Sequence, residues 1–431
     1  MIDISRKEFL RHLSAALATG LAAVGLQACS SGQADAPAGF RSLKTGSVAP
    51  GYGEPGAGPG KNAGYGPPIQ RKVALLLPLS GPQQALGRAL KQAGELALFE
   101  RDGNRIELMI RDDRGTADGA RLAAEDVIRG GAEIILGPVF SPAVAAVAPV
   151  AERSAVPVIA FSNDARVAGK GVHLLSFLPS QDVARTVEAA ARQGWRRFAL
   201  ATPDDAFGRM IEPMIQSAVM RSGGVIAARS SHSGTSAGAT TCAATLRGQI
   251  AEAERTSGPI DAIFVPGGPA ILSKMAQALA AAGVDTRRIK LIGTGGWEGI
   301  PPNLHASAHG AWLAAPEISG WRDFVARYTK AYGSAPPRIA TLAYDAIGVA
   351  IILSSSNEPR RFAAADLLKP NGFVGAEGPF RFTTSGVSER ALSIVTVSRE
   401  GPQVIELAAF PGAKPAPLVP GPSASIYSAP P

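Results

Sequence analysis

Polar side chains that could hold a small ligand follow several of the apolar runs in this chain of 431 residues. Hydroxyl, amide and carboxyl groups stand there beside glycine and proline, which permit tight turns. Together with the free N–H groups of a following helix, such groups can bind an anion such as a carboxylate. The candidate ligand-binding residues are Ser80, Ser141, Phe161, Ser162, Asn163, Asp164, Phe207, Trp297 and Glu298. Ser80 and Asp164 also fit the commoner role of helix N-caps.

Enzyme chemistry has little support in the sequence. The segment GTSAG at 234–238 matches G-x-S-x-G and His232 stands nearby, but the flanking residues resemble a loose polar loop rather than a sharp strand-to-helix turn. The five histidines form no HExxH motif, and the two cysteines, Cys29 and Cys242, form no C-x-x-C pair. We therefore predict a protein that is not an enzyme and that holds no metal and no cofactor.

The elements that would position these residues alternate between short apolar strands and amphipathic helices. The expected strands lie at 73–77, 106–110, 133–136, 156–161, 197–201, 225–228, 262–265 and 289–292. The expected helices lie at 84–100, 117–129, 143–153, 182–193, 207–222, 239–254 and 270–282. Fully apolar strands separated by helices indicate parallel sheets covered on both faces. The fold class is α/β with two doubly wound, Rossmann-like lobes and a ligand cleft at the carboxyl ends of the strands.

The first residues of the chain predict export. A basic tip precedes an apolar stretch at 13–26 that is too short to cross a membrane, as in a signal peptide. The sequence LQAC at 26–29 resembles the lipobox of bacterial lipoproteins, which implies removal of 1–28 and lipid attachment at Cys29. The segment 5–11 also resembles a twin-arginine export motif with Lys7 at the second arginine, so two export routes remain open.

Two segments lack the pattern of a folded core. Residues 29–69 are rich in glycine and proline and predict a disordered tether, and residues 410–431 predict a disordered proline-rich tail. The net charge of +8 is spread over scattered lysine and arginine residues, so we expect no nucleic-acid partner. A basic surface either favours anionic surroundings such as lipid headgroups or is simply solvated.

Several motifs of the folded body resemble the type I periplasmic binding proteins of the leucine/isoleucine/valine-binding family. The similarity runs in order through 73–82, 135–138 with Ser141, 156–162 and 342–346. It implies three crossings between the lobes, near Pro179, Gly293 and Gly386. The domain boundaries expected from these crossings are 70–180 plus 293–388 for lobe one and 181–292 plus 389–409 for lobe two.

The resemblance also implies roles in an amino-acid pocket. Ser141 matches the serine that holds the ligand carboxylate, and 162–164 matches the segment that binds the carboxylate and ammonium groups. Phe207 matches an aromatic residue that closes over the ligand. The acid that the second lobe contributes is not evident, although Glu298 could approach from the next strand end.

Four segments are similar to a subgroup of this fold, the penicillin-binding protein activators. They read LLPLSGPQQALG, LGPVFSP, VIAFSND and GTGGWEG. The resemblance implies a lipoprotein on the periplasmic face of the outer membrane that stimulates a peptidoglycan synthase, so its partner would be a penicillin-binding protein. The alternative is the solute-binding component of an ABC transporter, with an ABC permease as partner and a small amino-acid-like ligand.

Overall fold

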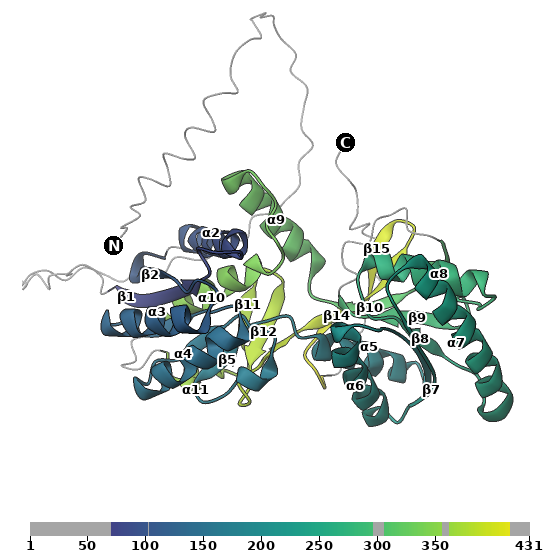
Figure 1. The fold of residues 1–431 in the computed structure, drawn as a ribbon. Coiled ribbons are helices and arrows are strands. Elements are labelled where there is room, and N and C mark those ends of the chain that lie inside the picture. The colour runs from purple at the N-terminus through teal and green to yellow at the C-terminus, as the bar shows by residue number, and fades with distance from the viewer. Residues whose placement is uncertain (1–69, 102, 296–305, 356–361, 414–431) are drawn as a thin grey trace, which may run out of the picture. The chain divides into compact units, whose positions relative to one another are not determined.

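The computed structural model describes residues 70–101, 103–295, 306–355 and 362–413 (Figure 1). Outside these residues lie the predicted signal peptide, Cys29, the tether, most of the tail, and the site residues Trp297 and Glu298. No helix within the described ranges has both the length and the apolar character needed to cross a membrane.

The first sheet is parallel and has the strand order β2-β1-β3-β4-β5. Its strands are β1 (Arg71–Leu77), β2 (Ile106–Asp112), β3 (Ile134–Leu136), β4 (Val158–Ala160) and β5 (Val172–Leu174). Four helices cover it: α2 (Gln84–Glu100) and α10 (Ala340–Ser354) on one face, α3 (Ala117–Arg129) and α4 (Ser141–Arg153) on the other (Figure 1).

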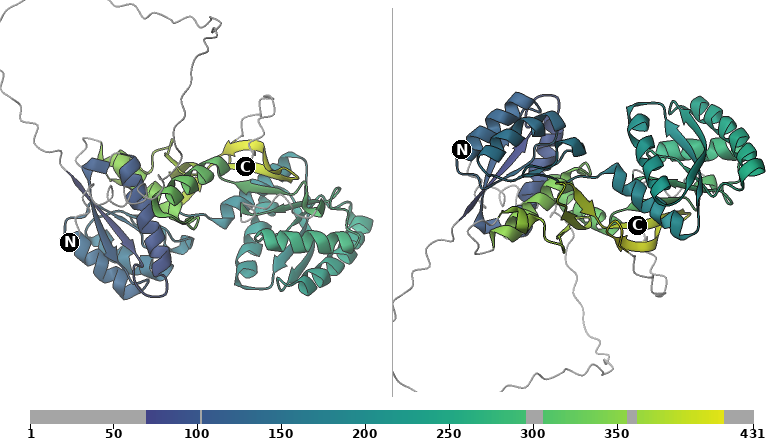
Figure 2. Two further views of the ribbon diagram at one scale, coloured as in Figure 1. Left: turned by 90° about the horizontal axis from the view of Figure 1, so that it is seen from above. Right: turned by 90° about the horizontal axis from the view of Figure 1, so that it is seen from below.

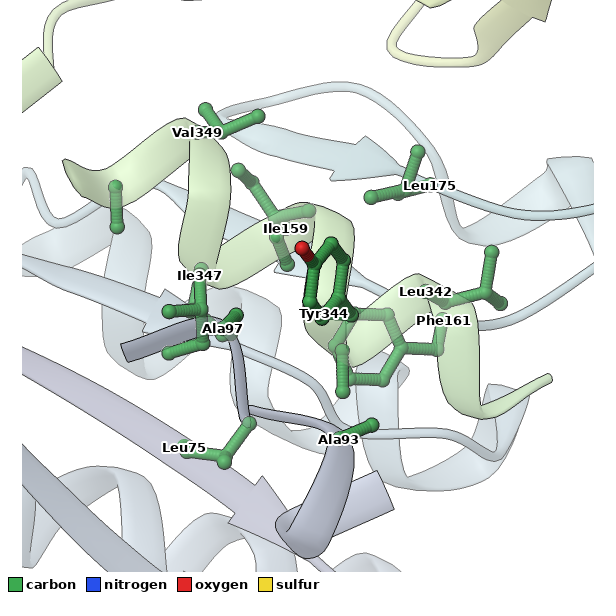
Figure 3. Packing of buried hydrophobic residues seen from close by; sticks show 14 of the residues in the cluster. Leu75, Ala93, Ala97, Ile159, Phe161, Leu175, Leu342, Tyr344, Ile347 and Val349 are labelled. Atoms are coloured by element: carbon green, nitrogen blue, oxygen red, sulfur yellow. The ribbon is translucent and has the colours of Figure 1, made fainter. Parts of the chain in front are cut away.

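Strand β1 shows why the buried part of a strand in this sheet is apolar at successive positions. Leu75 packs in the cluster that includes α2 and α10, whereas its neighbours Ala74 and Leu76 pack with α3 and α4. Successive side chains of a strand point to opposite faces, so a strand covered on both faces is apolar at every position. Figure 3 shows Leu75 beside Ala93 of α2 and Ile347 of α10.

The second sheet has seven strands in the order β15-β14-β10-β9-β8-β6-β7. Five of them run parallel: β6 (Arg197–Pro203), β7 (Val225–His232), β8 (Ala262–Phe264), β9 (Lys290–Gly293) and β10 (Trp312–Ala315). At one edge, β14 (Leu392–Ser398) pairs antiparallel with β10, and β15 (Gly401–Ala409) pairs antiparallel with β14 (Figure 2).

Helices cover this second sheet on both faces as well. One core cluster joins the sheet to α7 (Ser236–Ser257) and α8 (Pro269–Ala281). Another joins it to α5 (Pro179–Arg192) and α6 (Ala206–Arg221). The predicted α/β class with two Rossmann-like lobes is therefore confirmed.

A small antiparallel sheet was not predicted from the sequence. It consists of β11 (Phe373–Gly375), β12 (Gly378–Phe382) and β13 (Ser388–Arg390). Phe373, Phe380 and Phe382 of this sheet pack in the same cluster as α10. The remaining described helices are α9 (Ile318–Tyr332) and the short α11 (Ala364–Leu367).

The strand β10 departs from the expected domain boundaries. Residues 293–388 were expected in lobe one, but Trp312 and Leu313 pair with β9, and Leu313 lies in the core of the second sheet. The chain therefore returns to the first lobe after β10 rather than at Gly293. The expectation was wrong there because the pairing partner of a short strand is decided by tertiary contacts.

Candidate functional site

A cavity of about 500 Å³ lies at the carboxyl edge of the second sheet. Its wall is built from residues at or just after the ends of four strands. They are Pro203, Asp204, Asp205 and Phe207 for β6, His232, Ser233 and Gly234 for β7, Gly267, Gly268 and Ile271 for β8, and Thr294 for β9. Pro179, the first residue of α5, also lines it. The volume falls in the range of small-molecule sites, and its place at the strand ends is where parallel α/β sheets bind ligands.

The turn between β6 and α6 gives this cavity an aromatic ring and two carboxylates. Phe207, a predicted site residue, lines the cavity beside Asp204 and Asp205. Asp205 caps α6, because its Oδ1 accepts from the Gly208 N–H at 3.0 Å. A Cβ at Gly208 would overlap the carbonyl oxygen of Pro203, so only glycine fits this turn. Neither acid was predicted as a site residue, although both stand directly after an apolar strand.

His232, at the end of β7, contributes a buried imidazole to the wall. Its Nδ1 accepts from the Gly234 N–H at 3.2 Å, which leaves the proton of the neutral ring on Nε2. Burial lowers the pKa of His232 below its usual range. The neighbouring loop is held by Lys274, whose Nζ donates to the Gly234 carbonyl at 2.8 Å.

The G-x-S-x-G segment lies at a strand-to-helix turn and not in the loose loop that the sequence suggested. His232 ends β7, Thr235 caps α7 by accepting from the Gly238 N–H at 3.0 Å, and Ser236 begins the helix. Ser236 is nevertheless exposed to solvent. The Nδ1 of His232 already accepts from the Gly234 N–H, so this atom is not free to take a proton from the Ser236 hydroxyl.

Three predicted residues come together at the carboxyl edge of the first sheet. Ser141 begins α4 and hydrogen-bonds to the carboxyl of Asp164, and the Asp164 N–H donates to Ser162 Oγ at 3.2 Å. Arg166 donates to the same carboxyl through Nε and Nη2, each at 2.8 Å. These Arg166 bonds are the main reason that the pKa of Asp164 lies below its usual range. Asp164 also caps a short 3₁₀ turn, as its position in the sequence suggested.

The remaining candidates occupy different surroundings. Ser80 is exposed and hydrogen-bonds to Asp112, whose carboxyl also accepts from the Leu79 N–H at 2.9 Å. Asn163 is exposed. Phe161 was expected to bind ligand, but it is only 1% exposed and packs in the core cluster with α2 and α10 (Figure 3).

The structure has two α/β lobes, one with a parallel sheet and one with a mainly parallel sheet. A ligand-sized cavity at the carboxyl edge of one sheet and a polar cluster at that edge of the other are the features of a two-lobed binding protein. The family model described as periplasmic binding protein matches residues 70–402, and the chain belongs to this family. Membership implies a periplasmic location. A comparison with curated proteins found no significant match.

Solved structures share the fold at low sequence identity. A solute-binding protein of an ABC transporter from Rhodopseudomonas palustris BisB5, in complex with 3,4-dihydroxybenzoic acid, has a TM-score of 0.53 and 22% identity, covering 80% of this chain and 98% of that one. A branched-chain amino acid ABC transporter ligand-binding protein from Burkholderia xenovorans LB400 has a TM-score of 0.61 and 16% identity, covering 79% and 96%. An ABC transporter substrate-binding protein from Sphaerobacter thermophilus has a TM-score of 0.58 and 22% identity, covering 81% and 98%.

Proposed function

We propose that this chain is the solute-binding component of an ABC transporter, which captures a small molecule without chemical change and presents it to a permease. The observation that carries the proposal is the cavity of about 500 Å³ whose wall consists of strand ends of the second sheet. A space of this size, lined by an aromatic ring, glycine backbone and a few polar groups, suits a small solute.

The solute we propose is amino-acid-like and carries a carboxylate. Helix α4 begins without a side-chain cap, so the N–H groups of its first turn, apart from Pro142, offer donors to an anion, and the Ser141 hydroxyl joins them when it turns from the Asp164 carboxyl to the ligand. Arg166 offsets the negative charge of Asp164 beside them. In the second lobe, Asp204 and Asp205 offer carboxylates to an ammonium group.

The described ligands of similar structures support a transport role. One is described as binding 3,4-dihydroxybenzoic acid and another as a branched-chain amino acid transporter protein, and both ligand types are small carboxylates. The predicted role as a penicillin-binding protein activator has no comparable support. It stays a prediction based on sequence resemblance, as does a penicillin-binding protein partner.

A thermal-shift screen of the mature chain with amino acids and hydroxybenzoates tests the proposal. A ligand present at 100 times its Kd stabilises the folded state by about 2.7 kcal/mol, which is readily detected as a rise in Tm. A flat response to every compound, together with retention of a penicillin-binding protein in a pull-down, would favour the activator role instead.

Lipid attachment at Cys29, and with it an outer-membrane location, is a further part of the proposal that rests on the LQAC sequence at 26–29. We expect Cys29→Ser to move the protein from the membrane fraction to the soluble periplasmic fraction, because the thiol that carries the lipid is lost. Fractionation and immunoblotting measure this. A Cys242→Ser variant is the matched control, since Cys242 is buried in the second lobe and should leave the distribution unchanged.

A further inference from the structure

A group of charges, of which Asp345, Glu377 and Arg390 are buried and the others half-buried, lies where the chain passes between the two lobes. It contains three carboxylates and two guanidinium groups, which we call the crossing network: Asp182, Asp345, Glu377, Arg338 and Arg390. Asp182 belongs to α5 of the second lobe and Asp345 to α10 of the first. Arg390 ends β13, two residues before β14 enters the second sheet.

Two members of the network form a well-made pair. Arg338 Nε donates to Glu377 Oε2 at 2.9 Å, and the Thr341 hydroxyl donates to Glu377 Oε1 at 2.9 Å. Glu377 is 1% exposed, so this buried carboxylate has the partners that it needs. Arg390 is the guanidinium that lies beside Asp345, and the positive charges of Arg338 and of Arg390 both act on the carboxyl of Asp182.

Arg390 is poorly satisfied in the arrangement that the structure describes. It is 2% exposed, its Nη2 lies 3.5 Å from Asp345 Oδ2, and none of its three guanidinium nitrogens has a hydrogen-bond partner among the described residues. Its guanidinium carbon lies 4.7 Å from the centre of the Phe177 ring. A buried guanidinium without hydrogen bonds is costly, which favours a second arrangement in which it is better paired.

The two carboxylates are each held on their own lobe. Asp345 Oδ1 accepts from the Ala376 N–H at 2.6 Å, while its Oδ2 has no hydrogen-bond partner in the described chain. Asp182 Oδ2 accepts from the Gly295 N–H at 3.1 Å, next to Thr294 of the cavity wall. Burial raises the pKa of Asp182 to about 7 and that of Asp345 to about 6, which indicates that neither charge is fully compensated.

The backbone around Arg390 is fixed to the second lobe's first helix and not to either carboxylate. The Arg390 N–H donates to Gln181 Oε1 at 3.1 Å, and Gln181 Nε2 donates to the Ser388 carbonyl. Upstream, the Leu174 N–H donates to the Gly386 carbonyl at 2.7 Å. Two of the crossing segments therefore run side by side, and the Arg390 side chain can change partner while its backbone stays in place.

We propose that Arg390 is a switch between the lobes, which exchanges its partner between Asp345 of the first lobe and Asp182 of the second lobe when the lobes reorient. The switch is a positioning device for the proposed solute-binding function, since Pro179 and Thr294 connect Asp182 directly to the cavity. Removing either carboxylate leaves Arg390 with one partner and so favours one of the two arrangements.

Two isosteric variants test this proposal, because each should favour a different one of the two arrangements. Asp345→Asn should favour the arrangement paired through Asp182, and Asp182→Asn should favour the arrangement paired through Asp345. The labels for single-molecule energy transfer are placed at Glu152→Cys of α4 and Ala251→Cys of α7, in a chain with Cys29 replaced by serine and Cys242 by alanine. The transfer efficiency reports the populations of the two lobe arrangements without any ligand. We expect population ratios that change roughly fivefold or more, in opposite directions. Asp366→Asn, on the surface pair with Lys369, is the control.

The outcomes separate the switch from the proposed function. Shifts in the same direction, or no shift in either folded variant, would overturn the switch even if a solute binds. Opposite shifts in a protein that binds no solute would support the switch and count against the proposed function. Circular dichroism and Tm identify a variant that fails to fold, and Arg390→Lys then supplies a second reading. Lysine keeps the charge but loses the planar donor set. The two populations of lobe arrangement seen by energy transfer should therefore merge into one broad population in Arg390→Lys.

Discussion

The carboxyl edges of the two sheets differ in how their polar groups are used. At the first edge, Asp164 hydrogen-bonds to both Ser141 and Ser162, and Arg166 donates to both oxygens of its carboxyl. At the second edge, the turns after the strands leave a cavity of about 500 Å³. The first edge carries hydrogen-bonded polar groups and the second a cavity, so the proposed solute would meet polar groups on one lobe and a shaped wall on the other.

The largest effect is expected from breaking the shape of the second edge. Gly208→Ala would place a Cβ against the Pro203 carbonyl in the turn that carries Phe207, so we expect a loss of about 3 kcal/mol in the free energy of unfolding. Urea denaturation measures it. The control is Gly248→Ala in α7, where a Cβ meets nothing within 4 Å and should add up to about 1 kcal/mol of helix stability. Equal stability of the two variants would show that the turn is not constrained.

A buried acid beside the first edge gives the next effect, and it depends on pH. Asp113 follows β2, is fully buried, and has its pKa raised to about 6 by burial. A raised pKa means that the folded state binds the proton more tightly, so this stabilisation is complete below about pH 4 and is lost as the pH rises through about 6. The difference between these limits is roughly 3 kcal/mol.

The variant Asp113→Asn should remove that dependence. Its free energy of unfolding should vary less between pH 4.5 and 7.5 than that of the wild type, as denaturant titrations at several pH values would show. Asp118→Asn, in the first turn of α3, is the control because the side chain lies at the helix surface. If Asp113→Asn follows the wild-type pH profile, the carboxyl is ionised in the folded state over this range.

The smallest effect is expected from the first edge itself. Ser141→Ala removes a hydroxyl from the start of α4, and with it a hydrogen bond to a charged ligand group worth about 1.5–3 kcal/mol. Binding should weaken by roughly tenfold to a hundredfold in isothermal titration calorimetry. Ser257→Ala, at the far end of α7, removes a hydroxyl outside the cavity and should bind normally. Unchanged affinity of Ser141→Ala would show that Ser141 does not contact the ligand and that the second edge alone binds it.

The fold could be predicted where local pattern decides structure. Helices α2 and α3 occupy the predicted residues because their apolar spacing is helical and Thr116 caps α3 by accepting from the Gly119 N–H. The three-stranded sheet and the membership of β10 in the second sheet were missed. Both depend on pairing between segments far apart in the chain, which periodicity does not report.

The candidate site was predicted in part for the same reason. Strand ends located Ser141, Ser162, Asp164 and Phe207, because the carboxyl ends of parallel strands share one edge. Phe161 also follows a strand, but its large apolar ring packs into the core instead. The acids Asp204 and Asp205 went unrecognised because an aspartate before a helix is usually a cap. Asp205 is indeed one, and it lines the cavity as well.

The most direct test of the central claim, that the second-edge cavity holds the solute, is calorimetric binding by Phe207→Ala beside Phe99→Ala. Phe207 lines the cavity, whereas Phe99 is 45% exposed on α2 of the other lobe. With the best ligand from the thermal-shift screen, we predict at least about tenfold weaker binding for Phe207→Ala, because an aromatic contact and its buried area are lost. Phe99→Ala should match the wild type. Equal affinity of the two variants would contradict the account.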